Sequence, residues 1–335
     1  MIPIFLSLLI CLNILGISEA KENPGTVINV LKYGALGNGL TDDTAAIQAA
    51  INATPPNGIL FFPTPRVYYK ITSPLLLKSN LKITGNSSKI YMPSYPNDRT
   101  TTIFYTNKSS TTSNVDISGL KLQSTNDVSG VGFYAHSNTS NVMGFDFENT
   151  SHVDIHDLSI DSALYGIKLS VRSNDHVFIN DVKISNTATD IYMSHASDIH
   201  ISNSHLDSSG FLLTDHHLHN IYIEGAVSNV FIRDVSFANT AGGGIQIYQE
   251  SGFPSSNINI TNASFNNCHT ALIAWSKVKG VKVTGFTASS TPTILSINDA
   301  HGVTLSYGKI KLYRKLLLND TKTSTDIRFD HLTID

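Results

Sequence analysis

The chain has 335 residues, of which 15% are charged, and its formal net charge is −3. A chain of this length forms either two ordinary domains or one long solenoid. The weakly negative balance creates no global field that would attract nucleic acid or an anionic membrane, and we expect neither partner.

The chain opens with an apolar run over residues 2–17, followed by Ser-Glu-Ala at 18–20. Small residues at the first and third positions of this triplet are typical of signal-peptidase cleavage, here after Ala20. The run is short for a membrane span, and no second apolar stretch is long enough to cross a bilayer. We therefore predict a signal peptide over 1–20 and a single secreted, extracellular domain over 21–335, present as a monomer.

Cysteine use and glycosylation sequons agree with a secreted solenoid. Cys11 would leave with the leader, so the mature chain has one cysteine, Cys268, and no internal disulfide. Stacked coils supply a continuous core and need no disulfide. In a eukaryotic secretory pathway the chain would become a glycoprotein through its Asn-x-Ser/Thr sequons. These include Asn86, Asn107, Asn138, Asn149 and Asn319.

The first structured segment covers residues 28–70, as an amino-terminal cap and a first coil. A helix is predicted over residues 43–52, with Thr41 or Asp42 as its N-cap and an apolar face of alanine and isoleucine. Residues 55–58, Pro-Pro-Asn-Gly, end this helix, and the Ile-Leu-Phe-Phe that follows is typical of a buried strand. Further on, the stretch 92–113 is rich in Ser, Thr, Asn and Pro, which predicts a loop or an irregular coil.

From Val115 onward, a short phrase of alternating apolar and polar residues recurs, as in Val153–Ile160 and Val177–Ile184. The steps between successive copies from Val153 are 24, 22, 31, 28, 23, 22 and 24 residues. A period in this range marks a solenoid, and strands one full coil apart must run parallel with right-handed crossovers. We therefore predict an all-β fold, a right-handed parallel β-helix. The later copies open at Ile199, Val230, Ile258, Val281, Val303 and Ile327.

A polar residue recurs at the bend between the first two strands of each phrase. A row of carboxylates and amides at such a position is typical of turn residues, so we interpret it as a structural ladder rather than a catalytic row. Its members are Asp157, Asp181, Asn203, Asp234 and Asn262.

The amino-terminal segment Val30–Thr44, reading VLKYGALGNGLTDDT, is followed by AIQAAI at Ala46–Ile51. It resembles the opening signature of the pectate-lyase-like superfamily, which includes polygalacturonases, rhamnogalacturonases, glucanases and phage tailspike depolymerases. The resemblance implies a β-helix whose open end is capped by the predicted helix, and action on an acidic or neutral polysaccharide. In that setting Asp42 and Asp43 favour the helix amino terminus and are structural rather than a catalytic pair.

The resemblance does not carry over an active site. The Asn-Thr-Asp, Asp-Asp, Gly-His-Gly and Arg-Ile-Lys motifs of polygalacturonases are not found in the coils of this chain. Other members perform hydrolysis, β-elimination, epimerisation or binding alone. We expect no required cofactor, and the resemblance leaves open whether Ca²⁺ bridges substrate carboxylates, as it does in some members.

A further strand precedes each phrase, and four of these align at 167–169, 191–193, 221–223 and 245–247. Their apolar ends point inward, so their middle residues are predicted to stack on one outer face. Aromatic faces bind sugar rings and polar neighbours bond hydroxyl groups, which predicts a sugar-binding row, with a solvated face as the alternative. The middle residues are Lys168, Tyr192, Tyr222 and Gln246, and the next outward positions are Ser170, Ser194, Glu224 and Tyr248.

The long steps break the period beside these strands. The 31-residue step contains residues 214–220, Thr-Asp-His-His-Leu-His-Asn, and the 28-residue step contains an insertion at 249–256. Insertions in solenoids map to the binding side, so these two are predicted to wall a groove. Nine of the thirteen histidines lie between His152 and His219, and histidine exchanges protons near neutral pH.

β-Elimination or epimerisation of a uronate needs a base, an acid and a group that neutralises the carboxylate. We expect the base to be His217 or His219 and the acid to be Tyr222. The remaining substrate contacts are assigned to the carboxylate partners Lys168 or Arg172, and to Tyr192, His195, Gln246 and Tyr248.

Three alternatives stay open. A hydrolase would use two carboxylates across the bond, for which Asp215 and Glu224 are the best pair and Glu250 a third. The cluster Asp215, His216, His217 and His219 has metal-ligand types, but adjacent histidines on a strand point to opposite faces, and we assign no metal site. The third alternative is a non-catalytic, glycan-binding β-helix. The preferred expectation is a secreted carbohydrate-active enzyme with lyase or related uronate chemistry.

Overall fold

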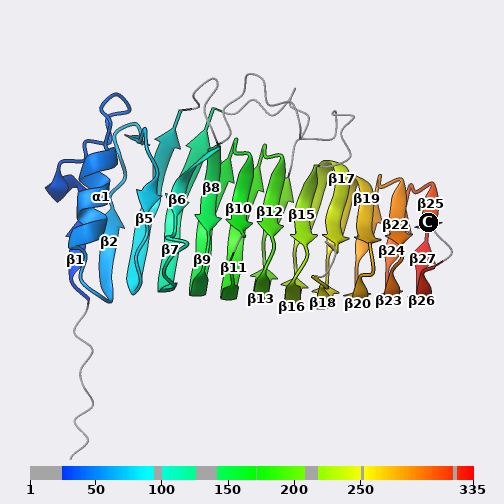
Figure 1. Cartoon of the computed structure of the whole chain (residues 1–335). Coiled ribbons are helices and arrows are strands. Elements are labelled where there is room, and N and C mark those ends of the chain that lie inside the picture. Colours follow the sequence, from blue (N-terminus) through cyan, green and yellow to red (C-terminus); the bar gives the residue numbers. More distant parts are fainter. Residues whose placement is uncertain are drawn as a thin grey trace, which may run out of the picture.

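The computed structural model describes residues 25–93, 100–125, 142–170, 172–207, 218–249, 253–319 and 323–335. In this part the chain forms a parallel β-helix with one α-helix at its amino-terminal end (Figure 1). Successive coils stack strand on strand in parallel, so the predicted fold class is confirmed. Within these residues, no helix is both long and apolar enough to span a membrane.

Each coil contributes strands to three faces of the solenoid, which we number in the order that the pairing gives. Face 1 consists of β4 (Leu75–Leu76), β6 (Thr101–Tyr105), β8 (Val142–Phe147), β10 (Tyr165–Leu169), β12 (Thr189–Met193), β15 (His219–Glu224), the second halves of β17 (Ser236–Tyr248) and β19 (Ser264–Trp275), β22 (Thr293–Asn298) and β25 (Lys315–Asn319).

Faces 2 and 3 share several long strands that bend at the corner between them. The shared strands are β5 (Leu81–Met92), β7 (Thr112–Ser124), β9 (Thr150–Asp161) and β11 (Asn174–Ser185). Face 2 also contains β1 (Val27–Asn29), β2 (Gly58–Phe62), β13 (Ala196–Ser202), β16 (Val227–Arg233), β18 (Ser256–Thr261), β20 (Lys279–Thr284), β23 (His301–Ser306) and β26 (Thr325–Asp330). Face 3 adds β3 (Tyr69–Lys70), β14 (His205–Asp207), the first halves of β17 and β19, β21 (Thr287–Ser289), β24 (Lys309–Lys311) and β27 (Thr333–Ile334).

The corner between faces 2 and 3 is built from residues in the left-handed backbone region. The predicted turn ladder lies here, and all five of its members have φ between 50° and 56°. Asn and Asp tolerate this region because their short side chains bond locally. The ladder is also linked across coils, since Asn262 Nδ2 donates to Asp234 Oδ1 at 3.1 Å.

The α-helix α1 (Thr44–Ala53) follows a short 3₁₀ helix η1 (Val30–Tyr33) and covers the amino-terminal end of the solenoid (Figure 1). It starts one residue later than predicted, and the N-cap position belongs to Asp43 instead of Thr41 or Asp42. The carboxylate of Asp43 turns into the glycine-rich loop, where it accepts from the N–H groups of Leu36 and Gly37 at 2.7 and 3.1 Å. The two acidic residues are therefore structural.

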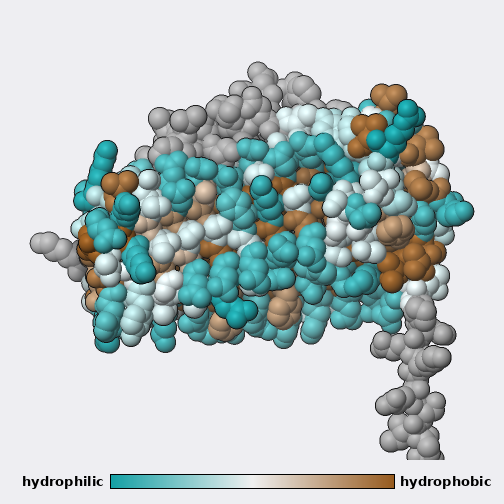
Figure 2. All heavy atoms as spheres, turned by 180° about the vertical axis from the view of Figure 1, so that it is seen from behind, coloured by the Kyte–Doolittle hydropathy of each residue, from teal (hydrophilic) through white to brown (hydrophobic). Residues whose placement is uncertain are grey.

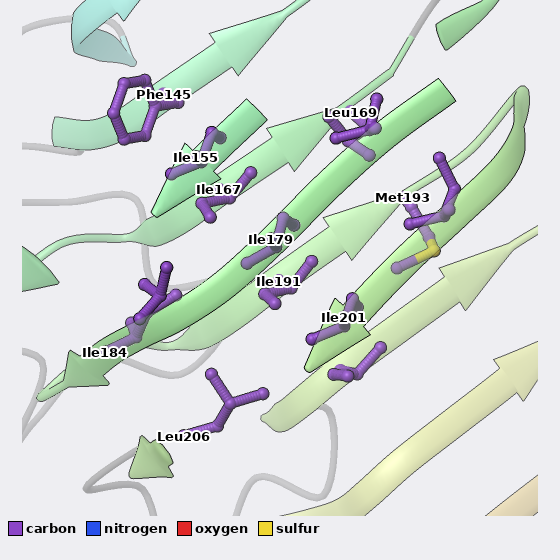
Figure 3. Close-up of a cluster of buried hydrophobic side chains, with 14 of the residues drawn as sticks. Phe145, Ile155, Ile167, Leu169, Ile179, Ile184, Ile191, Met193, Ile201 and Leu206 are labelled. Atoms are coloured by element: carbon purple, nitrogen blue, oxygen red, sulfur yellow. The ribbon is translucent and has the colours of Figure 1, made fainter. Parts of the chain in front are cut away.

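The interior is filled by ladders of identical or similar side chains from successive coils. Figure 3 shows Ile155, Ile179 and Ile201 of face 2 following one another, opposite Ile167 and Ile191 of face 1. Stacked phenylalanines continue the core toward the amino terminus, with ring centroids 5.5 Å apart for Phe104 and Phe145 and 5.3 Å for Phe145 and Phe147. Such ladders hold each coil in register with its neighbours.

The prediction of a loop or irregular coil over residues 92–113 is wrong in one part, because β6 lies within this stretch. The stretch is polar overall, but it contains two buried residues, Ile103 and Phe104, which are 1% and 0% exposed. Phe104 lies opposite Leu75 of β4 and Phe145 of β8 in the strand register. Tertiary packing therefore overrides composition here and extends face 1 by one strand toward the amino terminus.

The outer surface is mainly hydrophilic on the side shown in Figure 2, and exposed hydrophobic residues gather near the amino-terminal end. The large exposed apolar side chains at that end include Val27, Leu31, Leu36, Leu40 and Val67.

Candidate functional site

The predicted outward row exists on face 1. Lys168, Tyr192, Tyr222 and Gln246 lie opposite one another in four successive strands, β10, β12, β15 and β17. Neighbouring strands lie about 4.8 Å apart, so the row extends along the solenoid axis. Glu224 and Tyr248 are likewise opposite each other in the next outward row. Of these residues, Gln246 is 7% exposed, so little of its amide is accessible from outside.

The centre of the row is a hydrogen-bonded pair. The Tyr192 hydroxyl donates to Glu224 Oε2 at 2.6 Å, and the side chain of Ser194 hydrogen-bonds to the same tyrosine. Burial raises the pKa of Tyr192 far above its usual value, and the carboxylate of Glu224 raises it further. This tyrosine is therefore neutral and has an acceptor for its proton already in place.

Two further tyrosines surround this pair. The rings of Tyr165 and Tyr222 lie 5.5 and 5.7 Å from that of Tyr192, one tilted and one edge-on. Burial, followed by the charge of Glu224, raises the pKa of Tyr165 to about 12. Three tyrosine side chains thus stand near one carboxylate, an arrangement that can bond sugar hydroxyls and present ring faces or edges to a sugar.

Lys168 provides the cation next to this group. Its ammonium lies 3.3 Å from Asp146 Oδ1, and the two side chains are 21% and 18% exposed. Lys168 is also directly opposite Tyr192 in the strand register. A carboxylate bound at Lys168 would therefore lie about one strand spacing from the Tyr192 hydroxyl.

His219 lies beneath the row rather than on it, because its side chain is 1% exposed. Its Nδ1 accepts a hydrogen bond from the backbone N–H of Gly243 at 2.8 Å, and its ring lies 5.3 Å from that of Tyr222. Since Nδ1 accepts, the neutral ring carries its proton on Nε2. In this tautomer the lone pair of Nδ1 is taken by Gly243 and Nε2 carries a proton, so a role of His219 as a base would require a change of tautomer and stays a prediction.

The other predicted site residues are more dispersed. Arg172 is exposed just after β10, and His195 lies at a corner with φ of 51°, its ring 5.3 Å from that of Phe253. Tyr248 is half-buried at the end of β17. Both Asp215 and His217, together with His216 and Glu250, lie outside the described residues, so the predicted insertion cluster has no geometry to compare.

The row predicted from the sequence began at Lys168 and did not include its continuation toward the amino terminus. Register pairing places Tyr105 opposite Asp146, and Asp146 opposite Lys168. A hollow of about 360 Å³ opens beside these strands and is lined by Tyr105, Asp146 and Glu148, among others. A second hollow of about 160 Å³ shares Tyr105 and Asp146 with it. Aligning Phe104 with Phe145 and Ile167 would have revealed this extension.

No group of three or more histidine, cysteine or acidic side chains in the described ranges is arranged to hold a metal ion. The described side chains of the row can form hydrogen bonds, transfer protons and, through Lys168, neutralise a carboxylate.

Comparisons with known proteins agree with the β-helix fold. The family model of "Rhamnogalacturonase A/epimerase, pectate lyase-like" matches residues 27–291. No protein with a curated description matches the chain.

Among solved structures, the A-module of a mannuronan C-5 epimerase from Azotobacter vinelandii superposes with a TM-score of 0.67 at 15% identity. That comparison covers 91% of this chain and 94% of the module. An alginate lyase from Paenibacillus gives a TM-score of 0.58 at 14% identity, over 92% of this chain and 99% of the lyase. The Streptococcus pneumoniae surface protein and adhesin PfbA gives 0.60 at 15% identity, covering 92% and 99%.

These identities are low, so the structures show a shared fold and no shared activity. The family model spans most of the chain, from β1 into the segment after β21. On that basis, the chain belongs to the rhamnogalacturonase A/epimerase, pectate lyase-like family.

Proposed function

We propose that this protein is a secreted enzyme that removes a proton from a uronate ring of an acidic polysaccharide bound along face 1. The observation that carries the proposal is the 2.6 Å hydrogen bond from Tyr192 to Glu224, one strand away from Lys168. Membership of the family and the likeness to an epimerase and a lyase support the choice of a uronate substrate.

Lys168 is the binding partner for the uronate carboxylate. The ammonium group of Lys168 carries three N–H donors, and Asp146 accounts for one of them. The other two donors are available to a substrate. When Lys168 neutralises the negative charge of the carboxylate, the α-proton of the sugar ring becomes more acidic, which any proton-abstraction route requires.

Tyr192 and Glu224 form the proton-transfer unit. A free tyrosinate is disfavoured here because burial raises the pKa of Tyr192. Proton transfer is therefore concerted: the phenolic oxygen accepts the ring proton while its own proton passes to Glu224. In β-elimination the bond from C4 to the leaving oxygen then breaks, a C4=C5 double bond forms, and Tyr222 supplies a proton to the leaving oxygen. In epimerisation, the same acid returns a proton to the opposite ring face.

His219 is a positioning residue in this scheme. It is buried against Tyr222, and the backbone of Gly243 fixes its tautomer, so it orients the acid without touching the substrate. Its replacement should alter the rate and its pH profile more than substrate affinity.

The test uses uronate polymers of different linkage and stereochemistry. Absorbance of unsaturated products reports β-elimination, and NMR of the ring protons reports epimerisation. General acid–base groups contribute about 10²- to 10⁴-fold, so Tyr192→Phe and Glu224→Gln should lower turnover by that amount. Tyr307→Phe is the matched control, since this tyrosine is 58% exposed at the far end of the solenoid. Wild-type turnover in both site variants would refute the proposal, and binding without turnover on every polymer would favour a glycan-binding protein.

A hydrolase is the second candidate, favoured by Asp146 and Glu148 in one hollow. The two residues are two positions apart, which on an extended chain places their Cα atoms about 7 Å apart. Their side chains point to the same face, as a pair of catalytic carboxylates requires. New reducing ends without unsaturated product, lost in Glu148→Gln but retained in Glu224→Gln, would support hydrolysis over proton abstraction.

A further inference from the structure

A second groove lies at the corner between faces 2 and 3, away from the tyrosine row. It has a volume of about 510 Å³, larger than the hollows on face 1. Its lining comes from five successive coils, starting at Ser87 of β5 and ending at His205 of β14. Four strand spacings of about 4.8 Å give it a length of roughly 19 Å along the solenoid axis, enough for an extended oligosaccharide.

One wall of the groove carries an ordered row of cations and hydroxyls. Strand register places Lys121 opposite Ser159, Ser159 opposite Lys183, and Lys183 opposite His205. The two lysines are therefore two strand spacings apart, roughly 9.6 Å. Both are exposed, and neither forms an ion pair with another residue of the described ranges. An acidic ligand would meet two ammonium groups that have no carboxylate within ion-pair distance in these ranges.

The opposite wall consists of hydrogen-bond acceptors. Asp157, Asp181 and Asn203, the members of the turn ladder at this level, form that wall. The pKa of Asp157 is lowered, mainly by its hydrogen bond with His156, so this carboxylate is a charged acceptor. Leu158 and Val182, which separate the two rows in the sequence, have side chains that are 5% and 1% exposed and belong to the core beneath the groove.

We propose that this groove binds a chain of an acidic polysaccharide as a non-catalytic site, with the sugar chain parallel to the solenoid axis. Acidic groups on alternate sugars bind Lys121 and Lys183, because two strand spacings match about two residues of an extended pyranose chain. The acceptor wall bonds the sugar hydroxyls. A neutral polysaccharide leaves both ammonium groups without a partner. The groove therefore favours an acidic sugar chain whose carboxylates reach both lysines.

The site does not depend on the proposed reaction on face 1, and lysine protection separates the two. The full-length protein is acetylated at low reagent concentration with and without a hexa-uronide, and each lysine is quantified by mass spectrometry. We expect protection of Lys121 and Lys183, whereas Lys309 and Lys311, exposed on face 3 outside the groove, remain unprotected. Protection of Lys168 reports face 1 independently. Protection at Lys168 alone, or at no lysine, would overturn the second site.

Affinity measurements provide the matching mutational test. Lys121→Ala/Lys183→Ala should weaken binding of the hexa-uronide to the groove roughly tenfold or more, since two charge-assisted contacts are removed. The control pair Lys309→Ala/Lys311→Ala removes the same charge from the same face and should leave the affinity unchanged. A carboxyl-reduced, neutral hexasaccharide should not protect the groove lysines in the wild-type protein. Equal weakening in both double variants would mean that only net charge matters, and would overturn the proposal.

Discussion

Asp190 is a fully buried carboxyl group inside the solenoid, and it makes stability depend on pH in a defined direction. Its Oδ1 lies 2.5 Å from Thr187 Oγ1, and its Oδ2 accepts from Asn220 Nδ2 at 2.8 Å. Burial raises its pKa well above the ordinary value of 3.8, despite these two hydrogen bonds. The folded protein therefore keeps this group protonated at pH values where the unfolded chain has lost the proton.

The sign of the effect follows from proton binding. Between the unfolded and folded pKa values, the folded state binds one more proton, so the free energy of unfolding falls as pH rises. The stabilising effect is complete below the unfolded pKa, near 3.8, and is lost as pH rises through the folded pKa. For one proton the slope within this window is about 1.4 kcal/mol per pH unit, or about 2.7 kcal/mol over two units.

Asp190→Asn removes the titration and keeps the hydrogen bonds. The amide oxygen accepts from Asn220, and the amide nitrogen donates to the hydroxyl of Thr187, which rotates to accept. Urea unfolding followed by the fluorescence of Trp275, the one tryptophan in the chain, gives the free energy of unfolding at each pH. The difference between wild type and variant should fall with the stated slope and become constant above the folded pKa.

The control for this experiment is Asp330→Asn, because that carboxylate is 57% exposed. A difference curve that stays flat from pH 4 to 8 for Asp190→Asn would refute the reasoning. It would mean that Asp190 has the same pKa in the folded and unfolded chain.

Three further outcomes follow from packing and burial. Phe145→Ala should destabilise the fold by about 3–5 kcal/mol in the same urea assay, because it empties the middle of the phenylalanine stack. Gly119→Ala and Gly280→Ala both place a Cβ on a backbone with φ of 68°, which costs each variant about 1 kcal/mol. They differ in their surroundings, because only at Gly119 would the new Cβ lie 2.1 Å from the carbonyl oxygen of Gly85. Gly119→Ala should therefore cost about 1–3 kcal/mol more, and equal midpoints would contradict this. Burial raises the pKa of the Cys268 thiol to about 12, so a thiol reagent at pH 8 should modify the Cys268 peptide only in denaturant, as mass spectrometry can show.

The repeat period allowed most of the scaffold to be predicted. Because each strand lies one coil from its partner, the spacing of Val153, Val177 and Ile199 is sufficient to derive their pairing. The strand register of the row from Lys168 to Gln246 followed from the same period and is confirmed, although Gln246 is only 7% exposed. Strict alternation works here because one face of each strand is buried throughout.

The features that could not be predicted depend on contacts that the repeat period does not determine. The burial of His219 comes from the Gly243 backbone and the Tyr222 ring, and neither is visible as a sequence pattern. The polar composition around β6 concealed the strand that brings Tyr105 next to Asp146. Asp190 is a polar residue that is buried inside the solenoid. The alternation of polar and apolar residues assigns polar residues to the outer face, so its burial could not be predicted.

The register of face 1 has a consequence for how such a protein can change over evolutionary time. Lys168, Tyr192, Tyr222 and Gln246 are neighbours in space, yet each belongs to a different coil. Inserted residues at the corners leave the pairing intact, as the 31-residue step between Ile199 and Val230 demonstrates. Each position along this row can therefore be exchanged separately, one coil at a time, while stability is carried by contacts between nearest neighbours. A fold of this kind offers a series of independent positions at which the outer surface can be altered without rebuilding the whole.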